Sequence, residues 1–180
     1  SGAINVTATA GAISDNTALE NANLVTTGQV TLTAATGIGT SVADKDIDTT
    51  ISLLQATNNT SGDIYIQETN GLTINGTGVR TLGGNGNINV DVVAGNLTID
   101  SVVTANGSGT INLKAAAGTV DINAVVSSTS GQIDILGDVV TQDSDITTGG
   151  AAAINVTAET GAITMADLKT TTSGTGAVTY

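Results

Sequence analysis

The strongest constraint on this chain is a five-residue motif that recurs about every 23 residues along its length. The motif is a small residue, any residue, Ile or Val, a polar residue and a second large apolar residue. Repetition at such a period is typical of architectures in which each unit buries its apolar side only against its neighbours. The copies occupy residues 2–6, 28–32, 62–66, 86–90, 109–113, 131–135, 152–156 and 176–180.

The rest of each repeat predicts a second short strand. A second glycine usually follows nine residues after the first, as at Gly95 and Gly118, and a further alternating segment comes after it. Three residues later a third aliphatic residue, which is Val102, Val125 or Leu168, is expected to pack inside. A strand–helix–strand unit needs about 30 residues or more, so a repeat of about 23 predicts one coil of a β-solenoid instead.

The pattern within the motif predicts which side chains point inward. Strand side chains alternate between faces, so the two apolar residues should face the core and the polar residue between them should face solvent. The next inward position is small or tapering in most repeats, as at Ala34 and Ala115. Glu68 breaks this row, which predicts either a solvent-exposed corner or a register shift in that coil. We expect the motif glycines to lie at corners, where a positive φ favours a residue without a Cβ.

These observations predict an all-β fold: a parallel β-helix of about seven to eight coils that forms one domain over residues 1–180, or a segment of a longer one. One spacing is irregular, because Val30 and Ile64 are 34 residues apart whereas the other spacings are 21–26. We therefore predict a looped-out insertion over residues 39–60, as a hairpin or short helix. Insertions on one face of a solenoid often form its binding face, and a tolerated surface loop is the alternative. A smaller excess at residues 17–24 predicts one helical turn at a corner.

Composition excludes several functional classes. The chain has no Cys, His, Pro, Trp or Phe, which excludes disulfides, Cys/His zinc sites and Cys or His nucleophiles. Its formal net charge of −12 disfavours binding to nucleic acid, because neutralising phosphates needs a basic surface. No stretch of about 18 apolar residues exists, so membrane insertion is not expected. The chain opens with Ser1 and no basic-then-apolar leader, so we expect any secretion signal to lie outside it.

One acidic segment is a candidate metal site. Asp44, Asp46 and Asp48 alternate, so an extended segment would place all three on one face, and hard oxygen ligands of this kind suit Ca²⁺. The EF-hand pattern fails, because position six would be Thr49 and position twelve would be Gln55. A solvated acidic loop is the alternative, and the repeat itself requires no cofactor. Asp143 and Asp145 form a second, weaker pair.

Two other functions are compatible with a solenoid. Paired carboxylates can hydrolyse glycosides, but an enzyme that grips an acidic polysaccharide needs cations, and only Arg80, Lys45, Lys114 and Lys169 are present. We therefore expect no enzyme activity. Threonine ladders can bind ice, but among the outward pairs only Thr31 and Thr33 supply threonine at both positions. Neither pattern favours these functions over a structural one.

The repeat units resemble those of large bacterial surface proteins. The segments GAINVTATAGAI (2–13), GNINVDVVAGNLTI (86–99) and AAINVTAETGAITM (152–165) are similar to repeats of filamentous-haemagglutinin-like adhesins, autotransporter passengers and β-strand-repeat proteins. This resemblance covers nearly the whole chain and implies a right-handed parallel β-helix and export to the extracellular space or cell surface. It carries no catalytic motif.

These features predict a structural segment of a secreted bacterial surface protein, which forms a rigid rod in an extracellular fibre, sheath or surface layer. The stalk of a host- or surface-binding adhesin is the alternative function. The partners expected are copies that associate end to end, neighbouring repeats of the same polypeptide, and surface polysaccharide. Bare strand edges at the ends of a solenoid favour such pairing.

Overall fold

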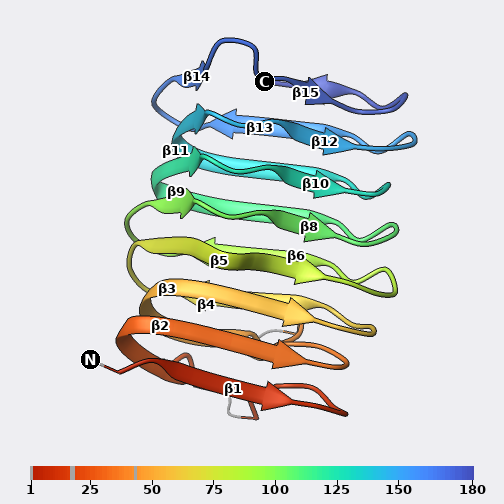
Figure 1. Ribbon diagram of the computed structural model, residues 1–180. Helices are drawn as coiled ribbons and strands as arrows, with labels where there is room; N and C mark the ends of the chain where they lie inside the picture. The colour runs from red at the N-terminus through yellow and green to blue at the C-terminus, as the bar shows by residue number, and fades with distance from the viewer. Residues whose placement is uncertain (1, 17–18, 43) are drawn as a thin grey trace.

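The computed structural model describes residues 2–16, 19–42 and 44–180, and it is a stack of coils along one axis with the termini at opposite ends (Figure 1). The described residues form 16 strands and no helix, so none of them belongs to a helix able to cross a membrane. The strands are β1 (Ile4–Ala8), β2 (Leu24–Ala34), β3 (Ile47–Asn58), β4 (Ile64–Glu68), β5 (Leu72–Thr81), β6 (Ile88–Val92), β7 (Leu97–Ile99), β8 (Val103–Ala105), β9 (Ile111–Ile122), β10 (Val126–Ser128), β11 (Ile133–Gln142), β12 (Ile146–Thr148), β13 (Ile154–Ala158), β14 (Ile163–Met165), β15 (Thr171–Thr172) and β16 (Val178–Thr179).

Every pairing between these strands is parallel, which confirms the predicted β-solenoid. The strands line three faces. Face A holds β1, β8, β10, β12 and β15 with residues 30–34, 54–58 and 79–81. Face B holds β4, β6, β13 and β16 with residues 111–115 and 133–137, and face C holds β7 and β14 with residues 72–74, 120–122 and 140–142.

The predicted inward rows form the core. On face B, Ile111 pairs with Ile88 on one side and with Ile133 on the other, and Ile133 pairs with Ile154. All four side chains are buried, as are the second apolar residues of the same motifs. Each coil thus covers the apolar side of the one before it, and water is excluded along the axis.

The third aliphatic position was predicted one residue too early at Val102 and Val125, and the prediction was wrong at Leu168. Val102 and Val125 are 37% exposed, and Leu168 is 98% exposed. The residues that fill the core are instead Val103 and Val126, which begin β8 and β10. The chain turns from face C to face A just before these strands, and this corner changes which residues point inward.

The predicted insertion over residues 39–60 is wrong for residues 47–58, which form β3 inside the stack. Val30 pairs with Leu54 on face A, whereas Ile64 pairs with Ile38 and Ile88 on face B. The five-residue motif therefore moves from face A to face B between Val30 and Ile64, and the coils keep their ordinary length. β3 lacks the motif but keeps buried aliphatic side chains inward, which explains why it stacks.

Glu68 lies where the motif changes face, and it is fully buried rather than exposed to solvent. Its Oε2 accepts hydrogen bonds from the Thr49 hydroxyl (2.6 Å) and the Ile51 N–H (3.0 Å). Its Oε1 accepts from the Asn70 N–H (3.0 Å). Burial raises the pKa of Glu68, and these hydrogen bonds oppose the rise. The carboxylate thus accepts hydrogen bonds from backbone N–H groups at the corner where β3 stops pairing with β4.

The motif glycines of face B lie above one another at a second corner. A Cβ on Gly86, Gly109 or Gly131 would collide with the carbonyl of the matching glycine one coil earlier. None of these three residues has a positive φ, so the predicted reason for glycine is wrong here. Glycine is needed because the backbones approach closely, and buried hydroxyls such as Ser128 and Thr148 bind the carbonyls between them.

We expect Glu68→Gln to lower the free energy of unfolding by about 1–3 kcal/mol, because an amide offers one acceptor oxygen where the carboxylate offers two. Urea unfolding followed by circular dichroism measures the change. Glu159→Gln is the matched control, since it makes the same chemical change on an exposed side chain. Equal stability of the two variants would contradict the role assigned to Glu68.

We expect Gly109→Ala to destabilise the protein by about 1–3 kcal/mol, because the added methyl group forces two stacked backbones apart. Gly11→Ala is the control, since a Cβ there has no neighbour within 4 Å. The same urea titration compares them. A loss no larger than that of Gly11→Ala would show that the column tolerates a side chain.

Candidate metal centre

Asp44 and Asp46 lie on a loop that leads into β3, and Asp48 is the second residue of that strand. The loop follows the bridge at Ile38, and the N–H of Thr40 donates to the carbonyl of Lys45 at 2.9 Å. Asp44 has a φ of 59°, a left-handed conformation that Asp adopts more readily than most residues. The segment therefore turns at Asp44, and the extended geometry expected from the alternation begins only as β3 does.

Two backbone contacts bring an earlier segment to this loop. The N–H of Asn23 donates to the carbonyl of Asp48 at 2.7 Å, and the N–H of Asp48 donates to Asn23 Oδ1 at 2.9 Å. These bonds attach the chain before β2 to the first residues of β3, one coil further along the axis. Glu20 lies three residues before Asn23, so its carboxylate reaches the acidic loop. Residues 19–23 are not helical, and residues 17–18 of the predicted helical turn lie outside the described residues.

Three carboxylates converge at this point. Glu20, Asp46 and Asp48 each offer an oxygen, and these oxygens all lie within 4.8 Å of one another. No other set of three potential metal-ligating side chains in residues 2–16, 19–42 and 44–180 comes this close. Of the predicted trio, Asp46 and Asp48 belong to this cluster, and Asp44 lies beside it in contact with Glu20. Sequence reasoning missed Glu20.

Burial differs sharply within the cluster. Asp48 is only 5% exposed, and its Oδ2 has no hydrogen-bond partner among the described residues. Asp46 is half-buried, whereas Glu20 and Asp44 are exposed. A further carboxylate, Asp15, is 7% exposed and near enough to act on Asp46 and Asp48. The cluster therefore runs from the protein interior to solvent.

Crowding and burial raise the pKa values of three of these groups. A hydrogen bond with Asp44 is the largest cause for Glu20, followed by burial and by the charges of Asp48, Asp44 and Asp46. Burial is the largest cause for Asp46, whose pKa the charges of Asp91, Asp15 and Asp44 raise further. Burial is also the largest cause for Asp48, with contributions from Asp46, Asp15 and Asp44. The negative charges here repel one another in the folded protein.

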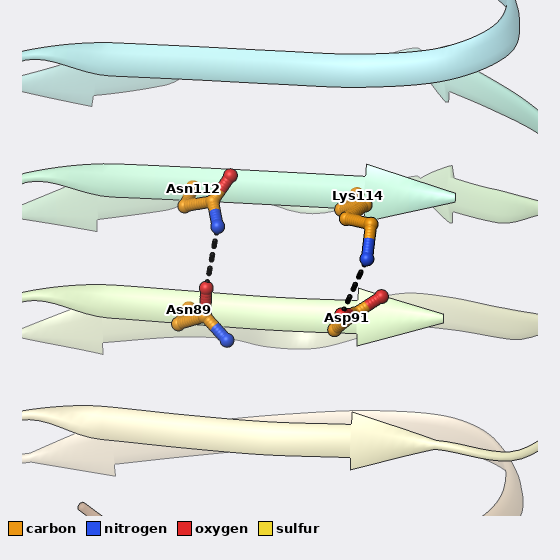
Figure 2. Close-up of polar contacts among 4 residues, drawn as sticks. All are labelled: Asn89, Asp91, Asn112 and Lys114. Atoms are coloured by element: carbon orange, nitrogen blue, oxygen red, sulfur yellow. Dashed lines mark hydrogen bonds and ion pairs between the residues drawn. The ribbon is translucent and has the colours of Figure 1, made fainter. Parts of the chain in front are cut away.

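The cluster borders a pocket of about 310 Å³ that opens over face B. Its other wall is the outward row of β4 and β6, where Tyr65, Gln67 and Asn89 lie. This row continues along the axis. Figure 2 shows Asn89 and Asp91 beneath Asn112 and Lys114, with Asn112 Nδ2 donating to Asn89 Oδ1 at 2.6 Å and Lys114 Nζ 2.9 Å from Asp91 Oδ2.

The second acidic pair predicted from the sequence, Asp143 and Asp145, does not form a cluster of carboxylates; Asp145 binds a neighbouring coil instead. Asp145 Oδ1 accepts from the Thr170 N–H at 2.8 Å and from the Thr170 hydroxyl at 3.2 Å, one coil further along. Asp143 is exposed. These contacts tie neighbouring coils together, so the pair does not resemble the convergent cluster at Asp48.

No family model, curated protein or solved structure matches this chain in the three comparisons made. The cluster has convergent carboxylates, an open side, and a buried oxygen that no described residue donates to. These features suit a cation better than an anionic or apolar ligand.

We expect the protein to become more stable as the pH falls from neutral towards the ordinary pKa values of its carboxyl groups, about 4, in a buffer without divalent cations. The pKa values of Glu20, Asp46, Asp48 and Glu68 are higher in the folded protein than their ordinary values. The folded state therefore binds protons more tightly in this range, and unfolding becomes less favourable as pH decreases. Thermal melting at several pH values measures the effect. A Tm that falls steadily as the pH decreases from 7 towards about 4 would contradict it.

Proposed function

We propose that this chain is a structural segment of a secreted bacterial surface protein and forms a rigid rod in an extracellular fibre, sheath or surface layer. The observation that carries the proposal is the continuity of the stack. Parallel strands pair from coil to coil along the whole stack (Figure 1). One cluster of buried aliphatic side chains runs through it from Val30 to Val156. Such a solenoid resists bending because each coil contacts its neighbours over three faces.

Surface side chains also form hydrogen bonds between neighbouring coils. Asn123 Nδ2 donates to Asp100 Oδ1 at 2.9 Å, and Asn155 Nδ2 donates to Asp134 Oδ1 at 2.7 Å. Like the contacts in Figure 2, these bonds join residues one coil apart. Polar ladders of this kind stabilise neighbouring coils and leave the outer surface hydrated, which suits a rod exposed to the extracellular medium.

The ends of the stack offer surfaces for axial association. In the described chain β1 pairs only with β2, and β16 pairs only with β13, so each leaves one strand edge open. Val178 of β16 stacks on Ile154 and is 40% exposed, whereas Ile154 is buried. A further coil of the same polypeptide or a second copy would complete this core. The alternative function, the stalk of an adhesin, uses the same rod without polymerisation.

Electron microscopy of the purified chain at about 150 mM salt, where screening reduces repulsion between acidic copies, tests the proposal. We expect filaments that grow with protein concentration. Val178→Lys should abolish them, because it places a charge at the inward position of the end strand. Thr179→Lys is the matched control on the adjacent residue and should leave them unchanged. Short isolated rods from the unmodified chain would favour the stalk function.

A further inference from the structure

The buried oxygen Oδ2 of Asp48 has no hydrogen-bond partner among the described residues. A buried polar atom normally has a hydrogen-bond partner, and a buried charge without one is costly. Four buried side-chain atoms lack a partner among the described residues, and Asp48 Oδ2 is the only one on a carboxylate. Asp48 is only 5% exposed, so bulk water does not supply a partner for this oxygen.

The neighbours of Asp48 are themselves acidic oxygen donors. Oxygens of Glu20, Asp46 and Asp48 lie within 4.8 Å of one another. Ligands of one Ca²⁺ lie about 2.3–2.6 Å from it, so two of them are at most about 5 Å apart. The spread of the three oxygens therefore matches a single ion between them. The adjoining pocket leaves the remaining positions open to water.

The surrounding charge favours a divalent cation. The charge of Asp44 raises the pKa values of all three carboxylates, and that of Asp15 raises those of Asp46 and Asp48. A bound cation would therefore relieve repulsion among five acidic groups. Ca²⁺ accepts irregular sets of carboxylate and water ligands, whereas Mg²⁺ needs a nearly ideal octahedron. The ligands here come from a loop, a strand and an exposed glutamate, so this irregular set suits Ca²⁺ better than Mg²⁺.

We propose that Glu20, Asp46 and Asp48 bind one calcium ion that joins the segment before β2 to the start of β3. The ion links two successive coils beside the corner where the motif changes face. Its binding free energy adds to folding stability, because the ligands come from segments that meet only in the folded protein. The site therefore strengthens the coil that departs from the regular repeat.

Terbium luminescence and calorimetry test this site on the chelator-treated chain. Tb³⁺ replaces Ca²⁺ at oxygen sites, and Tyr65 lines the adjoining pocket, so excitation of Tyr65 should give saturable Tb³⁺ emission that Ca²⁺ displaces. Calorimetry should show one Ca²⁺ per chain with a Kd of about 10⁻⁵–10⁻³ M, the range of moderate to weak calcium sites. Absence of saturable Ca²⁺ binding by calorimetry would overturn the proposal.

Variants separate a specific site from diffuse attraction to an acidic surface. Asp48→Asn and Asp46→Asn should each weaken Ca²⁺ binding at least about tenfold, whereas Asp143→Asn, an exposed acid outside the cluster, should leave it unchanged. Equal weakening by Asp143→Asn would contradict a defined site. Tyr65→Thr should remove the Tb³⁺ emission but keep Ca²⁺ binding in calorimetry.

Melting temperatures give a readout that a purely structural role of Asp48 would not produce. Without calcium, Asp48→Asn should be at least as stable as the unmodified chain, because it removes a repelled buried charge. With saturating Ca²⁺ the unmodified chain should become the more stable of the two. If Asp48→Asn is the less stable protein by the same margin in both conditions, Asp48 is structural and the calcium site is excluded. Filament formation is scored separately through Val178, so failure here leaves the proposed rod intact.

Discussion

Parallel stacking along the axis is the constraint on which the rest of the structure depends. Strands of adjacent coils lie about 4.8 Å apart, so each residue rests directly on the residue with the same role one coil earlier. Isoleucine stacks on isoleucine in the core, and asparagine binds asparagine on the surface. At the tightest corner the spacing leaves no room for a Cβ, which explains the column through Gly86, Gly109 and Gly131.

This constraint also explains what the sequence could predict. A residue that must match its counterpart every coil leaves a periodic record, so the core rows at Ile88, Ile111 and Ile133 were predictable from spacing alone. This periodic pattern in the sequence is weaker at the corners. Val102 and Val103 are both aliphatic, and only the path of the turn decides which of them enters the core. β3 was mistaken for an insertion because its aliphatic residues stack without the surrounding motif.

Only part of the acidic cluster could be predicted from the sequence, because one of its residues comes from a distant segment. Asp46 and Asp48 are close in sequence, so their alternation at the start of β3 could be seen directly. Glu20 joins them only because the hydrogen bonds between Asn23 and Asp48 fix how one coil sits on the next. Glu68 could be recognised as an exception to its row, but its partners Ile51 and Asn70 follow from the change of face. Contacts that occur once leave no periodic signal.

The change of face between Val30 and Ile64 also governs how such a gene can lengthen or shorten. Recombination between the motifs at Ile88 and Ile111 would delete or duplicate one coil and leave everything downstream in place. Recombination between the motifs at Val30 and Ile64 would join face A to face B and turn all later coils about the axis by one face. Repeats could therefore be gained or lost within either part of the stack, but an exchange between the two parts would shift the faces of all later coils.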